Sequence, residues 1–298
     1  MKSLTERLGV VIGKGPLAFR VAEIVSQKYD CAICFLDKDN FKRFRNKKTF
    51  SFYKFFPLTQ ISEILRFFDD LRVKKICMIG GLGRPSIGQL IFSDKEFKDI
   101  FEIIRGSGDT NTGRVVIKFL EDRGFQVFSC HEIVPEIVVS EGLYSGDLEK
   151  IKLECFTGFL FLTVADVFDF CQAVVVRKGQ ILAAEDFLGT DDLIERAYRT
   201  NLNEMVLVKS SKLSQDTRFD LPAIGEFTVN LLKKRNFIGL IVEAGKTLCH
   251  DLPQVIRFCQ ENNLIFASVS REFALGLCDY KSTELQKLLS VFDQKARI

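Results

Sequence analysis

The chain has 298 residues, enough for one large domain or for two ordinary domains that each bury a core. Hydrophobic residues make up 47% and charged residues 27%, and a net charge of +3 at pH 7 is too small by itself to indicate nucleic-acid binding. The longest apolar run, residues 156–176, contains Asp166 and Asp169, which argues against a membrane span.

The first half of the chain alternates between predicted strands and predicted helices. Apolar residues at 8–13 predict a buried strand, and 16–28 predicts a helix with Pro16 in its first turn. Further elements are expected as strands at 31–36, 75–80 and 125–129 and as helices at 61–73 and 112–123. This alternation predicts a Rossmann-like parallel sheet with helices on both faces.

The pattern lapses near residues 135–150, where Pro135 and two glycines interrupt it, so we expect domains at 1–139 and 140–298. A hairpin is predicted to turn at Lys178-Gly179. Around it we expect strands at 205–209, 239–243 and 264–269 and helices at 157–171, 191–200, 222–235 and 252–262. The second domain is therefore predicted to be a mixed α/β domain, and a further helix could follow residue 281.

A charged loop between residues 209 and 225 is the most informative segment for function. It gathers basic and acidic side chains and breaks at a proline before an apolar-periodic stretch: Lys209, Lys212, Asp216, Arg218, Asp220 and Pro222. Opposite charges at a predicted helix start suit a phosphorylated ligand and a divalent metal. A second acidic string, residues 185–192, also opens a predicted helix.

These two strings, with the Glu-Ala-Gly-Lys-Thr-Leu run ending at residue 248, resemble the C-terminal half of the LpxI-type UDP-2,3-diacylglucosamine pyrophosphatases of lipid A synthesis. The N-terminal half agrees through residues 13–17, 80–85 and 105–109. The resemblance covers roughly residues 8–270. Gly81 and Leu82 stand where the family has an Asn-containing loop, and Leu188 replaces a family Glu, so no general base is expected at 188.

The resemblance implies hydrolysis to UMP and 2,3-diacylglucosamine 1-phosphate (lipid X) with Mg²⁺ or another divalent cation such as Mn²⁺. It implies that Asp220 is catalytic or binds metal, with Asp216 and Asp191 as further metal ligands. The expected substrate contacts are Gly13, Gly15, Arg84, Asp109, Gly189, Thr190, Lys209 and Arg218. A helix-cap role stays open for Asp220, because Asp251-Leu-Pro253 repeats its tripeptide before a predicted helix, and also for Thr190.

Two other functional classes stay open. Gly13-x-Gly15-x-x-Ala18 followed by Asp37 fits the dinucleotide fingerprint of a nicotinamide-dependent oxidoreductase. A non-catalytic sensor of a phosphorylated lipid or nucleotide sugar would use the acidic loop only for capture.

The expected setting of the protein follows from its cysteines and from the resemblance. Cys31 and Cys34 form the only CxxC, which we interpret as reduced core thiols of a cytosolic protein rather than a zinc site. Lys14 and Arg20 interrupt the first apolar stretch, so no signal peptide is expected. The resemblance implies a cytoplasmic enzyme, peripheral on the inner membrane, that could form a homodimer and does not bind nucleic acid.

Overall fold

The computed structural model describes residues 7–45, 52–82, 90–91, 93–105, 109–213, 215–219 and 221–278. The chain forms two compact units. The first contains the residues up to Ile137 together with the segment Asp216–Leu221, and the second contains the rest. The segment around residue 218 therefore belongs to the first unit although the chain on either side of it belongs to the second.

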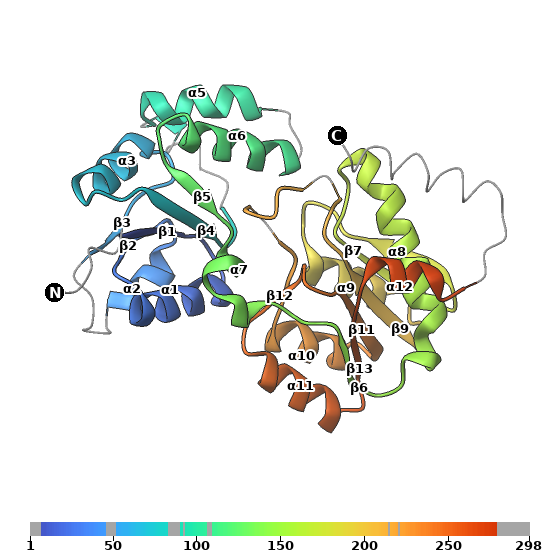
Figure 1. Cartoon of the computed structure of the whole chain (residues 1–298). Coiled ribbons are helices and arrows are strands. Elements are labelled where there is room, and N and C mark those ends of the chain that lie inside the picture. Colours follow the sequence, from blue (N-terminus) through green and yellow to red (C-terminus); the bar gives the residue numbers. More distant parts are fainter. Residues whose placement is uncertain are drawn as a thin grey trace. The chain divides into compact units, whose positions relative to one another are not determined.

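The first unit is built on a parallel sheet whose strand order is β3-β2-β1-β4-β5. The strands are β1 (Leu8–Ile12), β2 (Cys31–Phe35), β3 (Tyr53–Phe55), β4 (Lys75–Ile79) and β5 (Gln126–Phe128). Its helices are α1 (Pro16–Lys28), α2 (Lys38–Arg45), α3 (Ile61–Asp70), α5 (Lys95–Ile104), α6 (Asp109–Glu121) and the short α7 (Cys130–Ile133). Figure 1 shows α1 and α2 on one face of this sheet and α3 and α6 on the other. The predicted Rossmann-like sheet, covered on both faces, is confirmed.

The second unit has a mixed sheet of order β6-β13-β11-β9-β7-β8. The strands β9 (Met205–Lys209), β11 (Phe237–Glu243) and β13 (Ile265–Val269) are parallel, whereas β6 (Gly142–Ser145) and β7 (Ala173–Arg177) run antiparallel to their neighbours β13 and β9. The hairpin partner of β7 is β8 (Gln180–Ala184). The mixed α/β class predicted for this half is confirmed.

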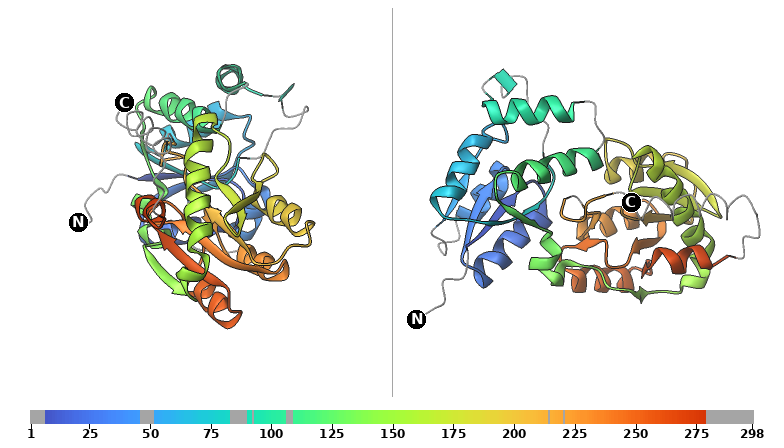
Figure 2. Two further views of the ribbon diagram at one scale, coloured as in Figure 1. Left: turned by 90° about the vertical axis from the view of Figure 1, so that its right-hand side faces the viewer. Right: turned by 45° about the horizontal axis from the view of Figure 1, so that its top comes forward.

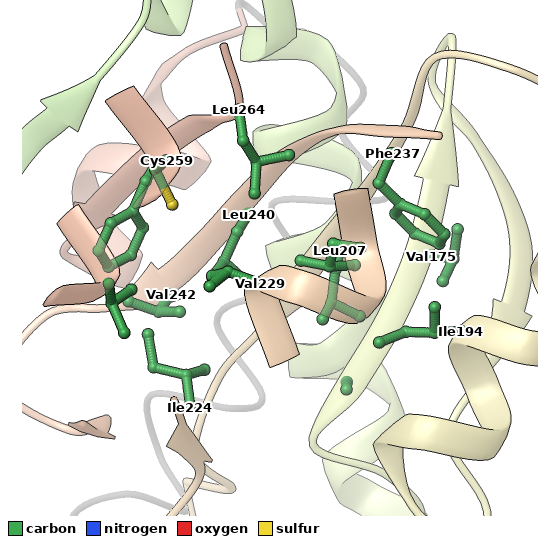
Figure 3. Close-up of a cluster of buried hydrophobic side chains, with 14 of the residues drawn as sticks. Val175, Ile194, Leu207, Ile224, Val229, Phe237, Leu240, Val242, Cys259 and Leu264 are labelled. Carbon is green, nitrogen blue, oxygen red and sulfur yellow. The ribbon is translucent and has the colours of Figure 1, made fainter. Parts of the chain in front are cut away.

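The helices of the second unit cover both faces of its sheet, as the two views in Figure 2 show. The helices α8 (Lys152–Ala165) and α12 (Arg271–Gly276) contribute to one apolar core. The other core, drawn in Figure 3, receives α9 (Thr190–Tyr198), α10 (Glu226–Lys234) and α11 (Leu252–Glu261). A small parallel ladder of β10 (Ala223–Ile224) and β12 (Leu248–Cys249) adjoins the α10–α11 side.

Strand alternation decides which face each residue of the parallel strands serves. On β9, Leu207 belongs to the core under α9–α11, and Val208 to the core under α8. The next residue, Lys209, therefore points to the α9–α11 face. By the same alternation on β11, Val242 faces α9–α11 and Glu243 faces α8 and α12.

Several expected boundaries differ from the structure. The helix expected from residue 222 begins at Glu226, because Ala223 and Ile224 pair with β12 first. The helix expected at 157–171 is α8, which starts earlier, at Lys152, and ends at Ala165. The tail after residue 281 lies outside the described residues. No helix in the described part of the chain is both long and apolar enough to cross a bilayer.

Candidate functional site

The two glycine turns at the carboxyl ends of β1 and β4 are bonded to each other through their backbones. Lys14 N donates to Gly81 O at 2.9 Å, and Gly81 N donates back to Lys14 O at 3.2 Å. A Cβ on Gly13 would stand 2.6 Å from Gly81 O, so this close approach requires glycine. Gly15 differs, because its φ of +104° suits glycine but open space surrounds it. Gly13 is therefore a packing glycine, and Gly15 leaves room for a ligand.

Asn40 on α2 fixes the first glycine turn, and Asp37 fixes the start of α2. The buried Asn40 amide donates to Gly13 O at 2.9 Å and to Gly15 O at 3.1 Å. The Asp37 carboxylate accepts from Asn40 N at 2.9 Å and so caps α2. Asp37 is the acid that the nicotinamide alternative assigns to a ribose, and in this structure it is used as a helix cap.

Of the other first-half candidates, Asp109 is the first residue of α6, and its side chain is outside the described part of the chain. Arg84 lies outside the described residues altogether. Their roles stay predictions.

The acidic loop of the sequence packs on α6 in the first unit. Arg218 donates through Nε and Nη2 to both carboxylate oxygens of Asp216, at 2.7–3.2 Å, and through Nη1 to Glu121 at 2.6 Å. The Phe219 ring lies against Gly113, where a Cβ would stand 2.7 Å from the ring. Hydrogen bonds from Arg218 lower the pKa of Asp216, and the carboxylates of Asp216 and Glu121 raise the pKa of Arg218. Arg218 is thus already paired with two acids.

Asp220 lies outside the described residues, but its surroundings bear on the alternative that it caps a helix. The helix α10 begins at Glu226 with Gly225 at its N-cap, five positions after Asp220 in the sequence, and the role of Asp220 itself stays a prediction. The second copy of the tripeptide does precede a helix: Asp251 is the N-cap residue of α11, although its side chain makes no capping hydrogen bond.

In the second unit, Lys209 lies at the end of β9 and is only 6% exposed. Its Nζ donates to Thr190 Oγ1 at 2.8 Å and to Ala223 O at 3.2 Å. Thr190 Oγ1 in turn donates to Glu185 Oε1 at 2.5 Å, and Gln172 N donates to Glu185 Oε2 at 3.3 Å. An ammonium group has three donors, so the third N–H of Lys209 has no partner among the described residues. A buried cation with a spare donor is suited to an anionic ligand.

The N-terminus of α9 lies beside this lysine. Gly189 is its N-cap residue, with a φ of +88° and open space where a Cβ would be. Thr190 is the first residue of α9 rather than its N-cap, and its hydroxyl donates to Glu185. Desolvation raises the pKa of Asp191, and the nearby Lys209 ammonium only partly offsets this. The carboxyl end of β9 and the start of α9 thus bring together four side chains: Glu185, Thr190, Asp191 and Lys209. Three of these, Thr190, Asp191 and Lys209, are site residues expected from the sequence.

A second polar network lies at the carboxyl ends of β9 and β11, on the face of the sheet covered by α8 and α12. It was not predicted from the sequence. Glu243 Oε2 accepts from Ser210 Oγ at 2.6 Å, from Ser211 N and Oγ at 3.0 Å, and from Arg271 Nη2 at 3.0 Å. Burial alone raises the pKa of Glu243, but the charge and hydrogen bonds of Arg271, with the Ser210 hydroxyl, outweigh it and bring the pKa to about 2. The carboxylate thus fixes the two residues that follow Lys209. Its sequence signal is a charge at the end of an apolar strand.

Lys212 is a buried structural residue rather than an exposed cation. Its Nζ donates to Asp169 Oδ1 at 2.6 Å and to Asp169 O at 3.1 Å, and only 3% of its side chain is exposed. Asp169 has a φ of +50°, so the ion pair holds a left-handed turn after α8.

The metal prediction rests on Asp220, Asp216 and Asp191. No group of three or more His, Cys, Asp or Glu side chains within the described residues converges as a metal site would require. Asp216 belongs to the first unit and is occupied by Arg218, whereas Asp191 belongs to the second and forms no ion pair within the described part of the chain. Of these two described carboxylates, that of Asp191 is therefore the more available as a metal ligand.

Comparison with known proteins gives matches for both halves of the chain. The model of the LpxI N-terminal domain matches residues 7–137, and that of the LpxI C-terminal domain matches residues 147–267. A relative from Caulobacter vibrioides named UDP-2,3-diacylglucosamine pyrophosphatase LpxI is 27% identical over 232 residues, which are 70% of this chain and 80% of the relative.

Proposed function

The chain belongs to the LpxI family, and on this premise we propose that it hydrolyses the pyrophosphate of UDP-2,3-diacylglucosamine in lipid A biosynthesis. The products would be UMP and 2,3-diacylglucosamine 1-phosphate, or lipid X. The observation that carries the proposal is the match of both family domains, in order, along most of the chain. The edge around Lys209 supports it, because a buried ammonium group beside a helix N-terminus suits a diphosphate.

In this proposal the described residues bind and orient the diphosphate. The third N–H of Lys209 would donate to a phosphate oxygen, with the first amides of α9 beside it. Gly15 and Gly189 would admit the substrate closely, since neither has a neighbour where a Cβ would stand. Arg84 and Asp109 would complete the substrate contacts.

Arg218 would contribute by exchanging partners. Its guanidinium now donates to two carboxylates, and a diphosphate presents acceptor oxygens of similar geometry. Substrate could therefore replace Asp216 or Glu121 on Arg218, which would free an Asp216 carboxylate.

A divalent cation, Mg²⁺ or Mn²⁺, is part of the proposal. When bound, such an ion neutralises charge on the diphosphate and activates a water molecule. Asp220 and Asp191 are its proposed ligands, and Asp216 would join them only after Arg218 releases it. We also propose a cytoplasmic enzyme that associates peripherally with the inner membrane, where its diacylated substrate resides, and that can form a homodimer.

The test compares two aspartates that stand in the same tripeptide. Asp220→Ala is expected to abolish UMP release in the presence of Mg²⁺, whereas Asp251→Ala, before α11, should retain it. Chelation with EDTA should stop the wild type, and added Mg²⁺ or Mn²⁺ should restore it. Equal turnover by both variants would remove Asp220 from the mechanism.

Binding and turnover assays on the wild type also distinguish the three functional classes. Tight binding of lipid X with no UMP release under any divalent ion would favour the sensor alternative. Binding of NAD(H), seen by fluorescence titration, would favour the oxidoreductase. The structure gives that alternative no support at Asp37, because this carboxylate caps α2.

A further inference from the structure

Helix α2 concentrates positive charge to an unusual degree. Its eight residues, Lys38–Arg45, contain four basic side chains and one acidic one, a net charge of 4 − 1 = +3. The entire chain of 298 residues has the same net charge of +3. Such a concentration on one short, exposed element is a local feature that the average composition conceals.

The charged side chains of α2 are separated from those that anchor it. Phe44 is fully buried, with its ring centroid 5.0 Å from that of Phe35, and Asn40 is tied to the first glycine turn. Lys38, Lys42 and Arg45 are exposed and spaced by four and three residues, so they share one side of the helix. We call these three residues the basic face of α2.

The cations of the basic face lack acidic partners among the residues that the structure describes. None of its three cations forms an ion pair within the described part of the chain, where other surface cations do, such as Arg66 with Glu63 and Lys118 with Asp122. Aromatic side chains lie next to it on the edge strand β3: the Lys38 ammonium is 5.6 Å from the Phe55 ring centroid, and Tyr53 and Phe55 are only partly buried. Unpaired cations beside partly exposed aromatic rings are typical of a membrane-interface surface.

We propose that the basic face of α2 docks on an anionic lipid bilayer. This rests on the proposed function, because a substrate with two acyl chains is delivered from a membrane, and it favours lipid over nucleic acid. The Asn40 hydrogen bonds join α2 to the glycine turn at the carboxyl end of β1. Docking through α2 therefore holds the substrate-binding end of the first unit near the lipid surface.

Each lysine or arginine close to an anionic surface strengthens binding about fivefold, so loss of all three should weaken binding about a hundredfold. The variant K38Q/K42Q/R45Q is compared with K98Q/K150Q/K234Q, which neutralises three exposed lysines on other elements. Sedimentation with phosphatidylglycerol–phosphatidylcholine vesicles should show the loss only in the first variant. Binding by the wild type should also weaken as salt is raised.

Equal vesicle binding by the two variants, or no binding by the wild type, would overturn the proposal. So would a preference of the wild type for a single-stranded oligonucleotide that the α2 substitutions abolish while vesicle binding stays unchanged. UMP release from substrate dispersed in detergent tests the proposed function separately, and the α2 variant should retain it.

Discussion

The buried ion pair between Glu243 and Arg271 allows a quantitative prediction for Glu243→Gln. Glutamine keeps the shape of the side chain but leaves the Arg271 guanidinium, whose side chain is 10% exposed, without its counter-charge. The pKa of Glu243 falls from 4.5 to about 2, which at 1.36 kcal/mol per unit corresponds to about 3 kcal/mol. Mutations that break one partner of a buried pair cost about 3–5 kcal/mol, so the two routes agree.

The assay is hydrogen exchange of the full chain, read on peptides from β9 and β11. A loss of about 3 kcal/mol should accelerate exchange there about a hundredfold, whereas β1 and β2 in the first unit should be unaffected. Glu204→Gln is the matched control, because the ion pair of Glu204 with Lys178 is exposed and contributes less than about 1 kcal/mol. Acceleration below tenfold in β9 and β11 would refute the reasoning.

The pH dependence provides a second check on the same pair. Because the pKa of Glu243 is lower in the folded state, its stabilisation is fully present above about pH 4.5 and is lost as the pH falls toward 2. The difference in thermal midpoint between wild type and Glu243→Gln should therefore be constant near neutrality and shrink below pH 4.5. A difference that persists unchanged at pH 3 would show that the charge is not what stabilises the site.

Two further predictions concern β9. Gly158→Ala should lower the thermal midpoint, because its Cβ would stand 2.5 Å from Val208 Cγ2 and such overpacking costs about 1–3 kcal/mol. The control is Gly276→Ala, where a Cβ would meet no neighbour. Equal midpoints for the two variants would contradict the contact between Gly158 and Val208. Lys209→Met should lower kcat/KM for UMP release about tenfold to a hundredfold, as expected for one charged hydrogen bond, whereas the exposed Lys234→Met should not. Wild-type turnover by a folded Lys209→Met protein would remove this lysine from the site.

Local sequence signals identified the central strands of both sheets and the hairpin, but they missed the short strands β3, β6, β10 and β12. The Lys178-Gly179 turn was predicted because two residues with positive φ close such hairpins, and the structure gives them φ values of +47° and +70°. The same reading missed α2, although Asp37 is a capping residue and Phe41 and Phe44 recur at helical spacing. The dense charges of α2 hid that spacing.

The features that could not be predicted from the sequence depend on contacts between distant segments. Nothing near residue 223 announces that Ala223 and Ile224 pair with β12, about 25 residues later, and this pairing delays α10. Likewise, Ser210, Ser211 and Arg271 reach Glu243 from 28 to 33 residues away in either direction, and only its ion pair with Lys246 is local. The family resemblance pointed to Lys209 and Thr190, but only coordinates join them through one hydroxyl. Asp220 and Arg84, outside the described residues, stay predictions.

The segment from Lys209 to Lys212 is polar in sequence yet almost wholly buried, and this combination gives it a physical role. Lys209 is held on the α9 face by Thr190, and the next two serines are held on the α8 face by Glu243. A lysine side chain normally loses about 2 kcal/mol of conformational freedom when a ligand immobilises it. In this segment the fold has already fixed the ammonium group, so an anion would meet a pre-oriented donor. In the proposed function, the Glu243–Arg271 pair would assist binding through the backbone that it holds rather than by contact.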